Sequence, residues 1–128
     1  MDKNSNALNW FEIPVTDLTR AKMFYETIFQ IKMQIMPEML GMKMAAFPGE
    51  AKSGKVIGAI CESEVHEPSM DGAVIYLNAN PSIQKVLDRI EPAGGQVLMP
   101  RTEITPETGY MAFFIDTEGN RIGLHAMQ

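Results

Sequence analysis

The chain has 128 residues, of which 45% are hydrophobic and 21% are charged, and this composition predicts one globular domain with a single core. Acidic residues outnumber basic residues by 16 to 11, so the formal net charge is −5 with histidine neutral. This charge, without a Lys/Arg cluster, argues against nucleic-acid binding and against a polybasic membrane contact. No apolar stretch approaches the roughly 20 residues that cross a bilayer, and residues 1–6 lack the apolar segment of a signal peptide. We therefore expect a soluble, cytoplasmic protein.

The single cysteine, Cys61, excludes an internal disulfide bond and fits a reducing compartment. Nothing close to it in the sequence would lower the pKa of its thiol. We therefore expect Cys61 to behave as a small buried hydrophobe.

The first half of the chain predicts a strand, a helix and three further strands. Residues 8–15 carry the aromatic and branched side chains of a strand, and Asp17 can cap the helix that follows. The apolar stripe of this helix recurs at three- and four-residue steps, at Leu18, Ala21, Tyr25 and Ile28. Extended patterns then follow at 31–37, 42–48 and 56–62.

The second half repeats this order. Residues 73–79 predict a strand, and Asn80 with Pro81 predicts the start of a helix that ends before Gly94. The expected strands that follow lie at 96–100, 110–115 and 121–126, with a hairpin turn at 117–120. When the first helix is shifted by 65 positions, its stripe falls on Ile83, Val86, Ile90 and Ala93.

Each half therefore reads as strand, helix, strand, strand, strand. One helix covers only one face of its sheet, so the other face needs a further partner. We predict an α+β fold of two β-α-β-β-β modules in a single domain over residues 1–128. Module one covers about 7–62, a linker about 63–71, and module two about 72–127.

Three sequence stretches carry a resemblance to a known family. They are NWFEIPVTDLTRAKMFYETIF at 9–29, PAGGQVLMP at 92–100 and GYMAFFIDTEGNRIGLH at 109–125. With these stretches the chain resembles the vicinal-oxygen-chelate superfamily, which includes glyoxalases and bleomycin-resistance proteins. The resemblance implies paired modules whose sheets curve around a small-molecule cavity, and a homodimer. It also implies a divalent metal in many enzymes of the family, whereas bleomycin-binding proteins share the fold without metal or catalysis.

The metal positions that the resemblance implies carry the wrong residues here. The first ligand, seven residues before the helix cap, corresponds to Trp10, the third to Ala73 and the last to Gly123. The second ligand belongs within residues 56–63, where the first acidic side chain is Glu62, near the end. We therefore expect no metal at this four-ligand site.

The alternation of strand side chains predicts which residues line the cavity instead. On the first strand, Phe11 and Ile13 should pack under the helix, while their neighbours face the cavity. The predicted ligand-binding residues are Trp10, Glu12, Phe113, Arg121 and His125.

Several of these residues allow both a functional and a structural interpretation. Glu12 is a carboxylate in an apolar strand, so it is either an acid–base group, an anchor for a ligand amine or hydroxyl, or an ion pair with Arg121 or His125. His125 suits acid–base work but is equally well a polar residue near a chain end. Trp10 is an aromatic floor for a ligand or part of the core. His66 lies in the linker, where we expect it to be exposed to solvent.

Eleven methionines are present, and five lie close together: Met33, Met36, Met39, Met42 and Met44. They suit an adaptable pocket wall or dimer interface, or a loosely packed core. Our leading hypothesis is a homodimeric protein that binds a small organic molecule without the family's usual metal. The alternative is an enzyme (a lyase, isomerase or dioxygenase) that uses Glu12 or His125 as an acid–base group or metal ligand. Whether the modules pair within one chain or between chains stays open.

Overall fold

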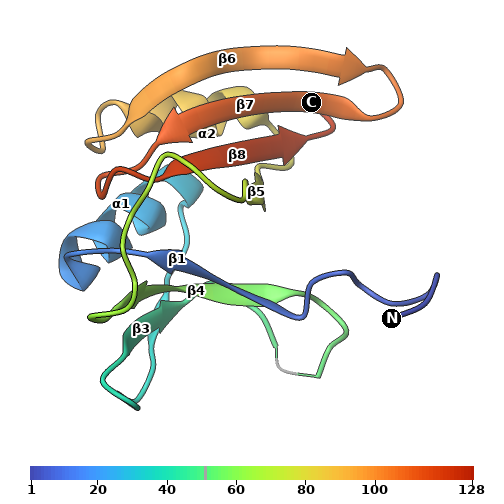
Figure 1. Cartoon of the computed structure of the whole chain (residues 1–128). Helices are drawn as coiled ribbons and strands as arrows, with labels where there is room; N and C mark the ends of the chain where they lie inside the picture. The colour runs from blue at the N-terminus through green and yellow to red at the C-terminus, as the bar shows by residue number, and fades with distance from the viewer. Residues whose placement is uncertain (51) are drawn as a thin grey trace.

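The computed structural model describes residues 1–50 and 52–128 and consists of two β-α-β-β-β modules (Figure 1). Module one contains β1 (Trp10–Pro14), α1 (Leu18–Phe29), β2 (Gln34–Ile35), β3 (Lys43–Ala46) and β4 (Ile57–Glu62). Module two contains β5 (Tyr76–Asn78), α2 (Ile83–Ile90), β6 (Gln96–Thr105), β7 (Gly109–Ile115) and β8 (Arg121–Ala126). The predicted α+β fold is confirmed, and the two helices begin 65 residues apart, at Leu18 and Ile83, as the sequence repeat requires.

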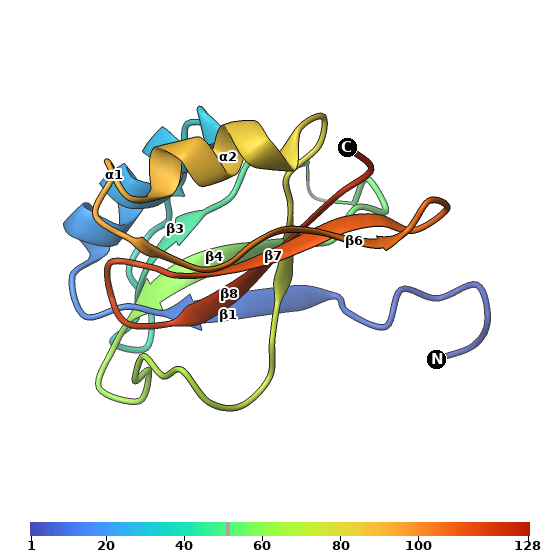
Figure 2. The same cartoon turned by 90° about the horizontal axis from the view of Figure 1, so that it is seen from above.

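The two modules have the same sheet topology. The strand order is β1-β4-β3-β2 in module one and β5-β8-β7-β6 in module two, and in each sheet the first strand pairs in parallel with the last. Both helices lie on the same side of the two sheets (Figure 2). We call the opposite side of each sheet its open face. The two helices are 12 and 8 residues long, and no helix in the described part of the chain could span a membrane.

Local sequence explains where the helices begin. The side chain of Asp17 accepts a hydrogen bond from the backbone N–H of Arg20 at 3.0 Å, as predicted for an N-cap. The second helix is capped by Ser82 and not by Asn80, so our expectation of an earlier start was wrong. The side chain of Asn80 is used elsewhere, because its Oδ1 accepts a hydrogen bond from the backbone N–H of Met127.

One continuous core lies between the helices and the sheets and joins both modules. Its largest fully buried side chains are Tyr25, Phe24, Phe114, Ile13, Ile28, Ile60, Ile83, Ile90, Leu124 and Val15. Burial of each large apolar side chain contributes about 1.5–3 kcal/mol. Because α1 and α2 both contribute to this core, the relative placement of the two sheets is fixed by packing rather than by the linker.

Three strands differ most in length from the sequence-based expectation, and the one expected at 73–79 is limited to the three residues of β5. The expected strand at 31–37 is reduced to β2, because Met33 turns into the core beneath α1 instead of pairing. The strand expected at 96–100 continues to Thr105 and pairs irregularly with β7, with a register shift between Met99 and Thr102. Pro100 lies within this shift and has no backbone N–H for the ladder, which explains the irregularity.

Candidate functional site

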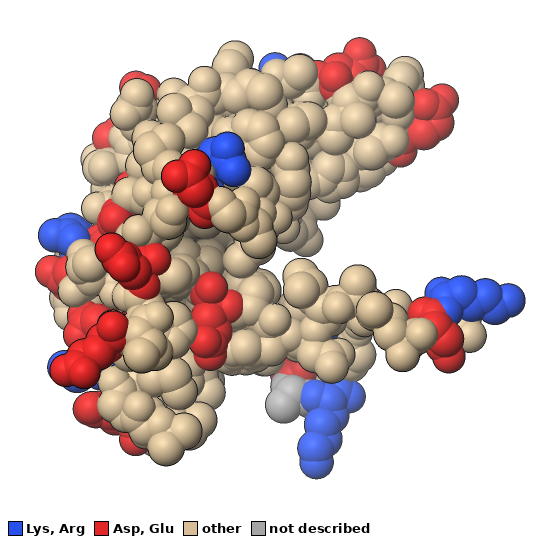
Figure 3. Space-filling view, in the orientation of Figure 1, with Lys and Arg blue, Asp and Glu red and all other residues tan. Residues whose placement is uncertain are grey.

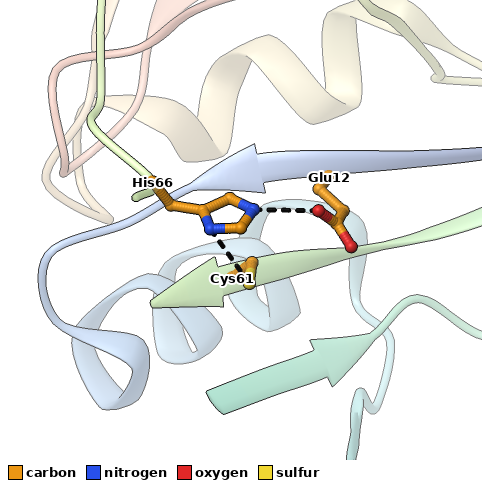
Figure 4. A group of neighbouring side chains, drawn as sticks. All are labelled: Glu12, Cys61 and His66. Carbon is orange, nitrogen blue, oxygen red and sulfur yellow. Dashed lines mark hydrogen bonds and ion pairs between the residues drawn. The ribbon is translucent and has the colours of Figure 1, made fainter. Parts of the chain in front are cut away.

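The open face of module one carries a polar cluster built from β1 and from the end of β4 with the linker that follows it (Figure 4). Glu12 comes from β1, Cys61 from β4 and His66 from the linker after β4. His66 Nε2 donates to Glu12 Oε1 at 2.8 Å, and Trp10 Nε1 donates to Glu12 Oε2 at 3.1 Å. On its other side, His66 Nδ1 lies 2.7 Å from Ser63 Oγ and 3.7 Å from Cys61 Sγ. The imidazole therefore bridges the carboxylate and the end of β4.

These contacts set the charge of the cluster. The hydrogen bond from His66 is the largest influence and lowers the pKa of Glu12, with a further contribution from Trp10, while partial burial opposes it. Glu12 is therefore ionised at neutral pH. Burial and the negative charge of Glu12 raise the pKa of the Cys61 thiol, so Cys61 stays protonated. A carboxylate can accept about four hydrogen bonds, and Glu12 uses two within the chain, so acceptor positions are left for a ligand.

The structure corrects two expectations about this region. His66 was expected to be exposed, but only 14% of its side chain is accessible. The partner of Glu12 is His66, not Arg121 or His125. A tight turn in which His66 N donates to Ser63 O directs the imidazole back over the sheet, and no periodic pattern in the sequence signals this return.

A divalent ion of the zinc type is the metal that this donor set suits, because carboxylate, thiolate and imidazole are its usual ligands. One ligand atom each from Glu12, Cys61 and His66 lie within 4.8 Å of one another. However, both nitrogens of His66 are already hydrogen-bonded, and metal binding would have to break one of these bonds. The imidazole of His66 therefore has no nitrogen left free for a metal.

The four-ligand metal site implied by the resemblance does not fit this chain. The indole of Trp10 and the methyl group of Ala73 cannot ligate a metal. At Gly123 an added Cβ would lie only 2.7 Å from Cδ1 of the Tyr76 ring, so a ligand side chain there would displace that ring. The donor set and the available space therefore both disagree with that site.

The other predicted site residues lie on the sheet of module two. The Phe113 and Tyr76 rings are 5.7 Å apart. His125 Nε2 donates to the backbone oxygen of Thr108 at 2.6 Å, which leaves Nδ1 as an acceptor in the neutral ring. In the described part of the chain, Arg121 Nε is buried without a hydrogen-bond partner. The structure therefore joins Trp10 to Glu12 and places Phe113, Arg121 and His125 on a separate sheet.

The hairpin between β7 and β8 fastens module two to module one. Asp116 is buried and accepts a hydrogen bond from Tyr25 Oη at 2.7 Å. Burial, together with the charge of Asp116, raises the pKa of Tyr25, so the phenol remains protonated and donates. Asn120 is also buried, and its Nδ2 donates to the backbone oxygen of Pro14 in β1. The Asp-x-x-Gly-Asn motif at 116–120 therefore has a structural role.

Two cavities in the described part of the chain bear on the site. The smaller one, about 480 Å³, includes His125 with Tyr76, Asn78 and Ile104. The larger one, about 990 Å³, lies between the modules on the helix side of the sheets and includes none of the predicted site residues.

Comparisons with known proteins identify the family. A family model described as the glyoxalase/bleomycin resistance protein/dioxygenase superfamily matches residues 7–124. The chain is 32% identical over 122 residues to the protein CFP32 of Mycobacterium bovis, and the match covers 91% of this chain but only 44% of that protein. It is 30% identical over 115 residues to a glyoxylase-like domain-containing protein of Didymella fabae, with 88% of each chain covered.

Solved structures agree with the fold. Glyoxalase I from Zea mays superposes with a TM-score of 0.68 at 17% identity, covering 94% of this chain and 46% of that enzyme. The protein SA1046 of S. aureus superposes with a TM-score of 0.65 at 23% identity, covering 94% of both chains. The chain spans less than half the length of CFP32, so the activity of that whole protein is not transferred to it. This chain belongs to the glyoxalase/bleomycin resistance protein/dioxygenase superfamily.

Proposed function

We propose that the protein binds a small organic molecule on its open sheet faces, without the family's usual metal. The contacting residues would be Trp10, Glu12, Phe113, Arg121 and His125. The observation that carries this proposal is the ionised Glu12 carboxylate, which is 31% exposed on the open face and has acceptor positions to spare. Such a group suits a ligand amine or hydroxyl.

The open faces offer apolar contacts beside this acceptor. Met44, Ala59 and Cys61 form a small buried cluster next to Glu12, with Met36 and Met42 packed against it. In module two, Arg121 contributes a buried donor without a partner in the described part of the chain. We therefore expect a ligand with an apolar body, a hydrogen-bond donor for Glu12 and an acceptor for Arg121.

Binding fits Glu12 better than general-base catalysis does. A base works best when its pKa lies near the working pH, but the hydrogen bond from His66 lowers the pKa of Glu12 away from neutrality. The alternative function, a lyase, isomerase or dioxygenase, would therefore depend on His125, whose Nδ1 is available as an acceptor.

Assembly and location complete the proposal. In the described part of the chain neither helix covers the open faces, and three large apolar side chains of module one are exposed: Ile35 at 57%, Met39 at 52% and Leu40 at 91%. We propose a homodimer that covers them. Light scattering at micromolar concentration should give twice the chain mass, and a monomer would contradict this.

We also propose one domain with the module limits given above and a cytoplasmic location, which the unpaired Cys61 fits.

A ligand screen by thermal shift, followed by calorimetry and mass spectrometry on the hits, tests the proposal. Glu12→Gln should weaken binding of amine- or hydroxyl-bearing ligands about tenfold or more, since a hydrogen bond to a charged group is lost. Glu107→Gln, an exposed carboxylate on the 106–108 turn, is the matched control and should leave affinity unchanged. Recovery of the ligand unchanged after hours supports binding alone. Conversion of the ligand to a product would favour the enzyme instead.

A further inference from the structure

The larger cavity lies apart from the proposed ligand site. It is about 990 Å³ in volume and opens between the two modules, and Figure 3 shows it as the notch between the upper and lower lobes. The cavity is bordered by β1 and β5, which are edge strands, so each pairs with only one neighbour in its sheet. Neither sheet therefore extends across the gap. A volume of this size is in the range of pockets that hold small organic molecules.

The walls of the cavity are mainly apolar. Phe11, Phe29 and Phe47 line it from module one, and Leu77 and Val86 line it from module two. The Phe11 and Phe47 rings lie 5.7 Å apart and pack against the core, so this wall is held in place rather than mobile. A rigid apolar wall favours the body of an apolar ligand, because the ligand gains contact without ordering the protein.

The polar end of the cavity is positively charged. Lys85 and Arg89 lie one turn apart on α2, and both line the cavity. Arg89 Nη1 donates to the backbone oxygen of Ile28 at 3.2 Å, which fixes the guanidinium and leaves most of its N–H donors free. Among the described residues, neither cation forms an ion pair and no Asp or Glu lines the cavity. This is the reverse of the chain's overall charge of −5.

We propose that this cavity binds a small amphipathic organic anion, with its apolar body against the phenylalanine wall and a single carboxylate at Lys85 and Arg89. The apolar lining accounts for the body, and two unpaired cations on one helix face account for the anionic head. Glu12 does not line this cavity, so this proposal can be tested independently of the proposed function.

Calorimetry with simple carboxylates tests the proposal. Octanoate should bind more tightly than hexanoate and butanoate, by about fourfold for each methylene that enters the cavity. The neutral analogue 1-octanol should bind more weakly than octanoate. The double variant Lys85→Gln/Arg89→Gln should weaken octanoate binding about tenfold or more, because charge-assisted hydrogen bonds are lost, while 1-octanol binding stays the same. The single variant Lys85→Gln keeps Arg89 and changes only an exposed helix position, so it should lose part of the octanoate affinity.

Two control variants identify the site. Lys3→Gln/Lys52→Gln removes the same number of charges at exposed positions outside the cavity and should leave octanoate affinity unchanged. Glu12→Gln should also leave it unchanged. Affinity that does not rise with chain length, or an equal loss in the Lys3/Lys52 control, would overturn the proposal. A loss in Glu12→Gln would place octanoate on the open face and would overturn it too.

Discussion

Glu118 joins the two modules, and replacing it by glutamine measures how firmly they are held. The side chain lies in the hairpin between β7 and β8 and is fully buried, at 0% exposure. Its Oε1 accepts from the backbone N–H groups of Thr16 and Asp17 at 3.0 and 2.9 Å, at the start of α1. Arg20 Nε donates to its Oε2 at 2.8 Å. The carboxylate therefore ties module two to the first turn of the module-one helix.

The pKa of Glu118 gives the size of the expected effect. Burial alone would raise this pKa, but the hydrogen bonds from Arg20, Thr117 and the α1 N-terminus outweigh it and lower the pKa from 4.5 to about 2. Each pKa unit corresponds to about 1.4 kcal/mol of stability. Because Arg20 is half exposed and solvent screens part of its interaction, we expect the ionised carboxylate to contribute about 2–3 kcal/mol. This contribution is complete above pH 4.5 and is lost as the pH falls towards 2.

Urea unfolding of the wild type and Glu118→Gln, followed by far-UV circular dichroism, checks this prediction. The variant should be less stable by about 2–3 kcal/mol at pH 7, and the difference should shrink as the pH is lowered towards 2. The exposed Glu107→Gln variant is the control and should change stability by less than about 0.5 kcal/mol at any pH. A difference between wild type and Glu118→Gln that stays constant from pH 7 to pH 2.5 would refute the reasoning.

Three further predictions follow from buried groups. Tyr25→Phe removes a hydrogen bond to the buried Asp116 and should cost about 1.5–3 kcal/mol in urea unfolding, and a neutral result would contradict its structural role. Cys61 has 0% exposure, so its reaction with a thiol reagent such as DTNB should be at least tenfold slower in the folded protein than in urea; equal rates would show that β4 opens readily. Because hydrogen bonds occupy both nitrogens of His66, titration with Co²⁺ should give no thiolate-to-cobalt absorption band. A stoichiometric band that disappears in Cys61→Ser would show that a metal displaces these bonds.

The elements that the sequence predicted correctly are those set by local periodicity. The four-residue steps from Leu18 to Ile28 place one helix face in the core, and Asp17 caps that helix as expected. Alternation along β1 places Ile13 in the core and lets Glu12 face away from the helices. Such patterns depend only on the 3.6- and 2-residue repeats, so they can be read without knowing the tertiary structure.

The contacts that the sequence did not predict depend on chain paths without a repeat. His66 reaches Glu12 across 54 residues, through a linker turn that no periodic pattern marks. The larger cavity was also missed, because it results from the spacing between two packed modules rather than from any one strand. Lys85 and Arg89 were not among the ligand-binding residues predicted from the sequence, although the i and i+4 spacing of two cations is a signal that could have drawn attention to them.

The proposed ligand site on the open face of module one differs in charge from the metal site that the family resemblance implies. A bound metal would attract the oxygen atoms of a substrate, but the side chain of Trp10 cannot ligate a metal and Gly123 has no side chain to do so. Two residues further along the same face of β1, about 7 Å away, the chain carries the ionised Glu12 instead. A metal-ligating side chain at position 123 would require two substitutions, one at Gly123 and one at Tyr76, because the Tyr76 ring occupies the space beside Gly123. A face built in this way attracts hydrogen-bond donors and cations, so ligands of this protein should differ in polarity from the vicinal oxygens that a metal recognises.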